Sequence, residues 1–214
     1  MKNAKISNAV IKRLPRYRRY LMELKKKGVE KVSSKELSDL IGYTASQIRQ
    51  DLNNFGGFGQ QGYGYSVDVL YNEISTILGL DKEYKMVIMG AGNLGQAITK
   101  YTHSYKGAFK VCSVFEIKEE LVGQMLDGIP IKNYKDIVDY IDEENIDIGI
   151  ICVNRDNAQE VADKLSIAGV KGIWNFAPVD IEVPEHIALE NVHLADSLHS
   201  LAYYMNDISK KEEK

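Results

Sequence analysis

The sequence has few of the residues from which disulfide frameworks, metal centres and membrane spans are built. Its 214 residues include only two cysteines, Cys112 and Cys152, and both lie inside apolar runs, "VCSVF" and "IGIICV". Two such cysteines form neither a disulfide framework nor a metal-ligand spacing, so we expect buried free thiols and no metal. No apolar run approaches the roughly 18 residues of a membrane span, and the N-terminal segment lacks the pattern of a secretory signal. We therefore expect a cytoplasmic protein with no membrane partner.

Charge is unevenly divided along the chain. Residues 1–80 carry 13 lysines and arginines against 7 aspartates and glutamates. Residues 81–214 carry the other 14 of the 27 basic residues and 23 of the 30 acidic ones. A basic front joined to an acidic back indicates two domains with different partners, the first of them polyanionic. The alternative is that the charged residues are unevenly distributed by chance.

Two helix-start signals lie close together in "VSSKELSDLIGYTASQIRQDL". Ser33 with Glu36, and Thr44 with Gln47, have the spacing of a capping box ahead of apolar residues. Gly42 between them allows a sharp turn. Two short helices joined in this way predict a helix-turn-helix, with a helical hairpin that serves only for packing as the alternative.

The second helix of this pair is expected to bury Ile48 and Leu52. Its exposed face then consists of polar residues that suit a major groove, because arginine can bridge guanine, glutamine can bridge adenine and serine can bind either. These residues are Ser46, Gln47, Arg49, Gln50 and Asn53.

A first helix is expected to open at Leu14-Pro15, since proline is tolerated in a first helical turn, and to end at Gly28. Basic residues on or beside it are candidate phosphate contacts: Arg13, Arg16, Arg18 and Arg19. After the helix pair, "NNFGGFGQQGYGYSV" interleaves glycines with aromatics and predicts a tight β-hairpin. A hairpin at this point is a wing, so residues 1–80 are predicted to form a winged-helix DNA-binding domain.

The stretch "VIMGAGNLGQAI" predicts a dinucleotide-binding turn. Gly90, Gly92 and Gly95 have the G-x-G-x-x-G spacing, with an apolar strand before them and a helical pattern after them. A second strand, "FKVCSVFE", ends at Glu116, where a carboxylate usually binds the adenosine ribose and disfavours a 2′-phosphate. The predicted cofactor contacts here are Gly90, Ala91, Gly92, Asn93, Leu94, Gly95, Glu116 and the nearby Lys118.

Further strands, "DIGIICV" and "GIWNFAPV", alternate with helices and predict an α/β domain with a doubly wound parallel sheet over residues 84–192. Ligands in such sheets lie beyond the carboxyl ends of the strands. That rule places the following residues near the cofactor: Val153, Asn154, Arg155, Asn175, Phe176, Ala177 and Pro178. A strand-ending turn without ligand contact is the alternative for "NFAP".

Residues 193–214 contain a terminal helix with an apolar stripe: Leu194, Leu198, Leu201, Ala202 and Met205. This stripe either folds back on its own chain or packs on a second protomer. The second arrangement suits a DNA reader that needs two half-sites.

Nearly end to end, the sequence resembles the Rex family of redox-sensing transcriptional repressors. The segments that carry the resemblance are "RLPRYRRYL", "VSSKELSDLIGYTASQIRQDLNNFGGFG", "GYGY", "GAGNLGQA", "GIWNFAPV" and "ENVHL". The resemblance implies a homodimer with winged-helix heads, Rossmann-like NAD(H) domains and C-terminal helices exchanged between protomers. It also implies that the protein binds operator DNA when NADH is low relative to NAD⁺ and is released when NADH binds.

Carried over residue by residue, the resemblance implies a phosphate contact at Arg16 and groove-reading roles for Arg49 and Gln50. Gln60 and Gln61 in the wing stand where the family often has a basic pair, which implies a flatter salt dependence. The residues implied in the redox switch between subunits are Tyr101, His193, where the family often has aspartate, and Leu194.

Two other functions remain open from the residues. One is a small NAD-dependent oxidoreductase with an accessory DNA-binding head, which would need a proton-transfer group beside the nicotinamide. None of the four histidines has a recognisable acid–base partner, and no second α/β domain follows to close over a substrate. The other is a DNA-binding protein whose Rossmann-like domain binds another nucleotide or CoA. We expect no enzyme, with NADH and NAD⁺ as effectors and not as redox substrates.

Overall fold

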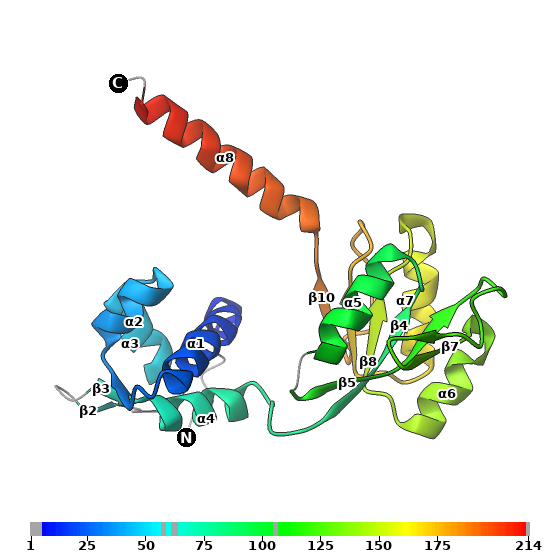
Figure 1. Cartoon of the computed structure of the whole chain (residues 1–214), viewed down its shortest axis with the longest axis horizontal. Coiled ribbons are helices and arrows are strands. Elements are labelled where there is room, and N and C mark those ends of the chain that lie inside the picture. The colour runs from blue at the N-terminus through cyan, green and yellow to red at the C-terminus, as the bar shows by residue number, and fades with distance from the viewer. Residues whose placement is uncertain (1–5, 57–58, 61–63, 105–106, 213–214) are drawn as a thin grey trace. The chain divides into compact units, whose positions relative to one another are not determined.

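The computed structural model describes residues 6–56, 59–60, 64–104 and 107–212 (Figure 1). The chain divides into two compact units, residues 1–82 and residues 83–214. Each unit has its own apolar core, and the two are described separately below.

The first unit combines a helix-turn-helix with a small antiparallel sheet. Its elements are α1 (Asn8–Lys26), β1 (Lys31–Val32), α2 (Ser34–Ile41), α3 (Ala45–Asn53), β2 (Gly59–Gln60), β3 (Gly64–Ser66) and α4 (Val67–Ile77). In the sheet β3 lies between β1 and β2, so β2 and β3 form the predicted hairpin after α3. The core side chains include Leu14, Tyr17, Leu21, Leu37, Ile48, Leu52 and Leu70.

Helix α1 begins earlier than the sequence predicted. Pro15 lies inside the helix and not in its first turn, because α1 starts at Asn8 after the N-cap Ser7. A proline there removes one backbone hydrogen bond. Val10 and Leu14, on the turns that precede it, are buried, and this packing outweighs the lost bond.

The helix-turn-helix forms from the predicted caps, with one difference. The Ser33 hydroxyl accepts from the Glu36 backbone N–H at 3.1 Å, and the Glu36 carboxylate accepts from the Ser33 N–H at 2.7 Å. Gly42 ends α2 with φ of 81°, a conformation that glycine adopts without strain. Thr44 caps α3, but the Gln47 side chain does not reach back to it, so the second capping box is only half formed.

The second unit is a parallel sheet with helices on both faces. Its strands are β4 (Tyr84–Met89), β5 (Phe109–Glu116), β6 (Met125–Leu126), β7 (Ile129–Asn133), β8 (Ile148–Ile151), β9 (Gly172–Asn175) and β10 (Ala188–Asn191). The strand order is β10-β9-β8-β4-β5-β7-β6, and only β6 runs antiparallel to its neighbour. From β7 to β10 this is the Rossmann order, and it reverses between β4 and β8.

The helices of the second unit are α5 (Asn93–Ser104), α6 (Ile137–Glu144) and α7 (Ala158–Ile167), with short 3₁₀ turns η1 (Tyr134–Asp136) and η2 (Arg155–Asn157). Residues of α6 and α7 pack with Met89 and Phe115 on one face of the sheet. Leu94 and Ile98 of α5 pack with Ile88 on the other. Ligands bind where the strand order reverses, so this topology predicts a ligand site at the carboxyl ends of β4 and β8.

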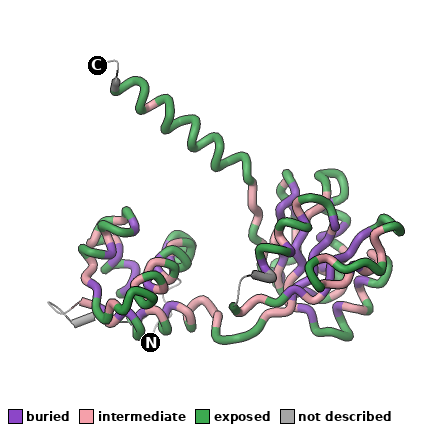
Figure 2. The backbone as a smooth tube through the Cα atoms, viewed as in Figure 1, coloured by how far each residue is buried: buried purple, intermediate pink, exposed green. Residues whose placement is uncertain are grey.

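The terminal helix α8 (Leu194–Glu212) has no packing partner in its own unit. Every residue from 194 to 211 is exposed except Asp207, which is half-buried (Figure 2). The exposed large apolar side chains are Leu194, Leu198, Leu201, Tyr203, Tyr204, Met205 and Ile208. The helix therefore does not fold back on its own unit. Among the described residues, no helix is both long and apolar enough to cross a membrane.

Candidate functional site

The exposed face of α3 carries most of the side chains predicted to read DNA. Ser46, Arg49, Gln50 and Asn53 are all exposed. The Arg49 guanidinium donates to the hydroxyl of Ser34 at 3.0 Å, an exposed bond that tethers it at the start of α2. This face presents donors and acceptors of the kind that recognise base edges in a major groove.

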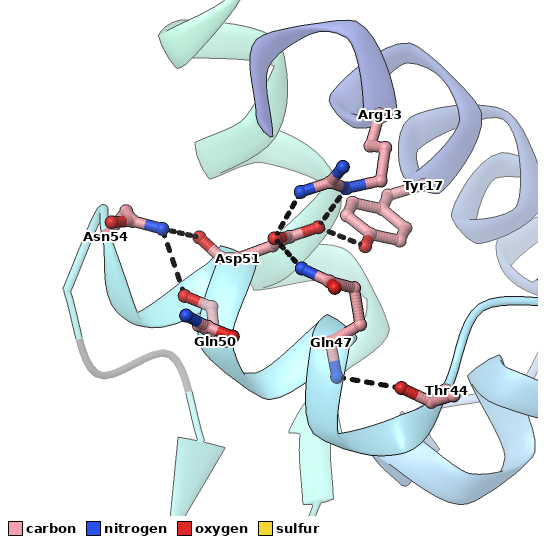
Figure 3. A network of polar contacts seen from close by, with 7 residues as sticks. All are labelled: Arg13, Tyr17, Thr44, Gln47, Gln50, Asp51 and Asn54. Atoms are coloured by element: carbon pink, nitrogen blue, oxygen red, sulfur yellow. Dashed lines mark hydrogen bonds and ion pairs between the residues drawn. The ribbon is translucent and has the colours of Figure 1, made fainter. Parts of the chain in front are cut away.

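Gln47 lies on the same helix but turns inward. Its side-chain N–H donates to the Asp51 carboxylate at 2.8 Å (Figure 3). Arg13 donates to both oxygens of that carboxylate, at 2.6 and 2.8 Å, and the Tyr17 hydroxyl donates at 2.6 Å. The expectation that Gln47 is exposed like its neighbours is therefore wrong: it is half-buried and helps to hold α3 against α1.

The Asp51 side chain is 1% exposed, so its charge depends on these partners. Burial alone would raise the pKa of Asp51, but the hydrogen bonds from Arg13, Tyr17 and Gln47 outweigh it and hold that pKa below its usual value. Burial and the bond to Asp51 raise the pKa of Tyr17. The network therefore keeps Asp51 ionised and Tyr17 protonated at neutral pH.

Two of the four arginines proposed as phosphate contacts are bound internally. Arg13 belongs to the Asp51 network, and Arg18 donates to Ser75 and Tyr71 at 2.9 and 2.7 Å. These internal bonds compete with a phosphate contact at either residue, which stays a prediction. Arg16 is exposed, with its guanidinium 5.1 Å from the ring centre of Tyr43, and remains a candidate together with the exposed Arg19.

The wing is described in part. Gln60 lies in β2, opposite Gly64 of β3. Gln61, the other predicted wing contact, lies outside the described residues.

A cavity of about 410 Å³ opens at the carboxyl ends of β4, β5 and β8. It is lined by Met89, Gly90, Gly92, Phe115, Glu116, Ile117, Lys118, Tyr134, Cys152, Val153, Asn154, Asn157, Glu160 and Val161. Six of the predicted cofactor contacts are among them: Gly90, Gly92, Glu116, Lys118, Val153 and Asn154.

The three motif glycines have three different surroundings. Gly90 has φ of 102°, and a Cβ there would lie 2.9 Å from the carbonyl oxygen of Cys152. A Cβ on Gly95 would collide with the Gly90 carbonyl oxygen, so this glycine lets α5 start close to the turn. A Cβ on Gly92 would meet nothing within 4 Å. Gly92 therefore borders open space where a pyrophosphate can approach the backbone.

Glu116 lies at the end of β5 and is buried. One carboxylate oxygen accepts from the backbone N–H of Ala91 at 2.8 Å, and the other accepts from the N–H groups of Ile117 and Lys118 at 2.8 and 3.2 Å. These bonds fix the carboxylate at the cavity wall and tie β5 to the glycine turn. The N–H of Ala91 is thereby occupied.

The other predicted cofactor contacts do not line this cavity. Ala91 and Gly95 are buried, Leu94 is half-buried beside the sheet, and Asn93 is exposed at the start of α5. Asn175 is fully buried, and its amide bonds to Val179, Asn191 and Ala177. The rest of "NFAP" comprises Phe176 and Ala177, which are buried, and Pro178, whose carbonyl accepts from Arg155.

Sequence reasoning did not identify the wall formed by Tyr134, Asn157 and Glu160. Tyr134 follows β7, a five-residue strand that contains Pro130 and lacks the apolar run of a buried strand. Asn157 and Glu160 lie where "DIGIICV" leads into α7, so the rule for strand ends could have been extended to them.

The residues of the implied switch are separate from the cavity. Tyr101 on α5 is 59% exposed, and Leu194 at the start of α8 is 59% exposed. His193 precedes α8, with Nε2 2.9 Å from a carboxylate oxygen of Asp180. The described residues contain no cluster of three side chains that could hold a metal ion.

The two thiols are free, and both are partly accessible rather than fully buried as expected. Cys152 lies in the cavity wall, where burial raises its pKa to about 12. It is therefore a protonated thiol at neutral pH and a poor nucleophile.

A helix-turn-helix unit joined to a Rossmann-like unit, with a cavity at the glycine turn, defines a class of protein: a transcription regulator with a small-molecule effector site. Two family models agree with this division. One, described as "Putative DNA-binding protein N-terminus", matches residues 5–53, and one described as "CoA binding domain" matches residues 81–179.

Relatives and solved structures narrow the class. The redox-sensing transcriptional repressor Rex of Thermoanaerobacter pseudethanolicus is 54% identical over 206 residues, which cover 96% of this chain and 92% of that protein. The same repressor of Clostridium tetani is 55% identical over 206 residues, covering 96% and 98%. The chain belongs to the Rex family of redox-sensing transcriptional repressors, and it is a repressor, not an enzyme.

The solved structures of one Rex-family repressor, RSP, share this fold. The structure of RSP matches with a TM-score of 0.90 and 51% identity, covering 99% of this chain and 100% of that one. RSP in complex with β-NAD⁺ and operator DNA matches with a TM-score of 0.90 and 53% identity, covering 97% and 96%. RSP in complex with β-NADH matches with a TM-score of 0.90 and 50% identity, covering 98% and 99%.

Proposed function

We propose that this protein binds operator DNA as a homodimer and leaves it when NADH occupies the cavity at the glycine turn. The observation that carries the proposal is the cavity itself, which is bordered by Gly90, Gly92 and Glu116 in a chain that also has an exposed α3 face. The complexes of RSP with NADH and with NAD⁺ and operator DNA support it.

At the cavity, the pyrophosphate lies over Gly92 at the start of α5, where open space and backbone N–H groups favour an anion. The adenosine ribose binds Glu116, whose fixed carboxylate repels a 2′-phosphate and favours NAD(H) over NADP(H). Lys118, Val153 and Asn154 complete this part of the site.

On DNA, Ser46, Arg49 and Gln50 read base edges, and Arg16 contacts a phosphate. Gln47 supports α3 from within through Asp51. The wing, with Gln60 and Gln61 in place of cations, contributes few phosphate contacts, so the dependence of affinity on salt is shallow.

Three parts carry out these tasks: residues 1–80 bind DNA, 84–192 bind the dinucleotide, and 193–214 form the dimer. The apolar face of α8 is covered by the second protomer, which also brings two heads to two half-sites. The cytoplasm is the proposed location, because operator DNA is there and free thiols persist in a reducing compartment.

NAD⁺ and NADH share their adenosine and pyrophosphate, so Gly92 and Glu116 cannot tell them apart. The nicotinamide end distinguishes them, because only the oxidised ring is cationic. We assign this end to "NFAP" with Tyr101 and to the partner protomer's His193 and Leu194.

The test is an operator duplex, obtained by in-vitro selection and labelled for fluorescence anisotropy, titrated with NADH, NAD⁺ and CoA separately. NADH is expected to release the DNA at the lowest concentration. Gly92→Val is expected to bind the duplex normally and to ignore NADH, because the new side chain fills the pyrophosphate space. Release by CoA alone, or by NADH from the Gly92→Val protein, would contradict the proposal.

A further inference from the structure

Asn175, at the end of β9, is fully buried, and its side-chain amide bonds to two different segments of the chain. The amide nitrogen donates to the Val179 carbonyl at 2.7 Å and to the side-chain oxygen of Asn191 at 2.8 Å. The amide oxygen accepts from the backbone N–H of Ala177 at 3.0 Å. Breaking any of these bonds would leave a polar group unpaired in the interior, which is strongly unfavourable.

The first of the two segments leads into α8. Asn191 is the last residue of β10 and lies directly opposite Asn175 in the parallel pair of strands. The next residue, Val192, donates its backbone N–H to the Asn175 carbonyl at 2.8 Å. Helix α8 begins two residues further on, at Leu194 (Figure 1). Asn175 therefore joins the start of α8 to the sheet.

The second segment, residues 176–180, is joined to the wall of the cavity. The Arg155 guanidinium donates to the Pro178 carbonyl at 3.1 Å. Arg155 belongs to the turn η2, whose neighbouring residues Asn154 and Asn157 both line the cavity. The Asn154 side chain accepts from the Asn157 backbone N–H at 3.3 Å, which ties this turn together. A continuous set of hydrogen bonds therefore runs from the cavity wall to residues 176–180.

A second contact between residues 176–180 and the start of α8 is exposed. A carboxylate oxygen of Asp180 lies 2.9 Å from Nε2 of His193, and the Asp180 side chain is 80% exposed. Exposed pairs contribute little, because water and salt screen them. The buried bond between Asn175 and Asn191 is therefore the stronger link between the two segments.

We propose that Asn175 is a positioning residue that couples occupancy of the cavity to the placement of α8. A molecule that shifts the cavity wall shifts residues 176–180 through Arg155. Asn175 then either follows, taking Asn191 and the start of α8 with it, or loses a buried hydrogen bond. This inference rests on the proposed function, since it assigns the link between the NADH site and the dimer helix. Such a link is demonstrated when its removal changes the coupling between two binding sites.

The test measures the operator affinity of the full-length protein by fluorescence anisotropy, without NADH and with saturating NADH. The ratio of the two affinities is the coupling factor, about 5- to 150-fold for a typical allosteric protein. Asn191→Ala and Asn191→Leu both remove the acceptor oxygen and are expected to reduce this ratio at least about twofold, the contribution of one hydrogen bond. Asn191→Asp keeps an acceptor oxygen and is expected to keep the wild-type ratio.

Two further measurements separate coupling from folding and from NADH binding. The melting temperature reports on folding, and the fluorescence of bound NADH gives the affinity without DNA. A merely structural role for the bond would change these two quantities and leave the ratio of operator affinities as it is. We expect the DNA-free affinity for NADH to stay close to the wild-type value in all three variants of Asn191.

Two control variants are expected to keep the wild-type ratio. Asn133→Ala removes an asparagine that ends β7, on the other side of β4, and bonds to Glu119. Asp180→Ala removes the exposed contact with His193. The inference would be overturned by a wild-type ratio in both Asn191→Ala and Asn191→Leu, or by an equal loss in Asn191→Asp or in either control. The proposed function would stand in those cases, whereas failure of NADH to release the wild-type protein from DNA would overturn both.

Discussion

Removing the Arg13 cation and removing the Asp51 charge should lower the free energy of unfolding by different amounts. The Asp51 side chain is 1% exposed, whereas that of Arg13 is 21% exposed. Arg13→Met leaves a fully buried carboxylate without its cation, and losses of this kind are worth about 3–5 kcal/mol of stability. Asp51→Asn leaves a guanidinium that water can reach and keeps one acceptor oxygen, so we expect about 1–3 kcal/mol. The double variant buries no charge and should lose less than the sum of the two.

Urea unfolding can measure these losses in the full-length protein. Far-UV circular dichroism follows both units, and Trp174, the sole tryptophan, reports on residues 83–214 alone. The circular-dichroism transition assigned to the first unit should move to lower urea in each single variant. The fluorescence of Trp174 serves as the internal control. Equal losses in the two single variants, or a strictly additive double variant, would refute the reasoning.

The same network predicts a dependence on pH. The folded-state pKa of Asp51 is lowered, so its contribution to stability is complete above its unfolded-state pKa, about 3.9. That contribution is lost as the pH falls through the folded-state value. The gap in stability between the wild-type protein and Asp51→Asn should therefore be constant from pH 7 to about pH 5 and close below about pH 4. A gap that closes near neutral pH would contradict this assignment.

Three further outcomes can be measured on the same protein. Gly92→Ala should keep the wild-type melting temperature but bind NADH about 5- to 150-fold more weakly, if the added methyl costs about 1–3 kcal/mol in the complex. Gly95→Ala should lower the melting temperature instead, because its methyl group would collide with the Gly90 carbonyl oxygen. Calorimetry of both variants checks this, and a lowered melting temperature in Gly92→Ala with an unchanged one in Gly95→Ala would contradict it. Arg49→Ala should lose about 1–3 kcal/mol of preference for operator over random duplex, whereas Arg16→Ala should weaken both alike, as competition anisotropy over a salt series would show. Deletion of residues 193–214 should abolish dimerisation and the NADH response together, and a truncated protein that sediments as a dimer would place the interface elsewhere.

The elements with strong local signals could be predicted from the sequence. The glycine turn, the Ser33 cap and the turn at Gly42 each depend on residues within a few positions of one another, so spacing alone specifies them. The start of α1 could not be predicted from the spacing of neighbouring residues. The residues before Pro15 are helical because Val10 and Leu14 are buried, and burial depends on distant parts of the chain.

Side-chain direction was the harder part of the site. The spacing of Thr44 and Gln47 favours a capping box, but Asp51 lies one turn further on and competes for the same amide. Asp51 prevails because it is buried with Arg13, a contact across 38 positions that no local pattern reveals. Tyr134 was missed for a related reason, since β7 owes its place in the sheet to pairing with β5 and not to its own composition.

The exposed helix α8 ties the lifetime of the protein to its abundance. Most helices owe their stability to packing, and α8 packs on nothing within its own unit. In the proposed homodimer the surface that covers α8 comes from another chain, so the folding of this helix would be second order in protein. At low copy number the segment stays open to proteases, and at high copy number it is protected. Degradation would therefore remove the protein while its concentration is low and would slow once the concentration allows α8 to be covered. The amount of the protein would then be controlled without any additional component.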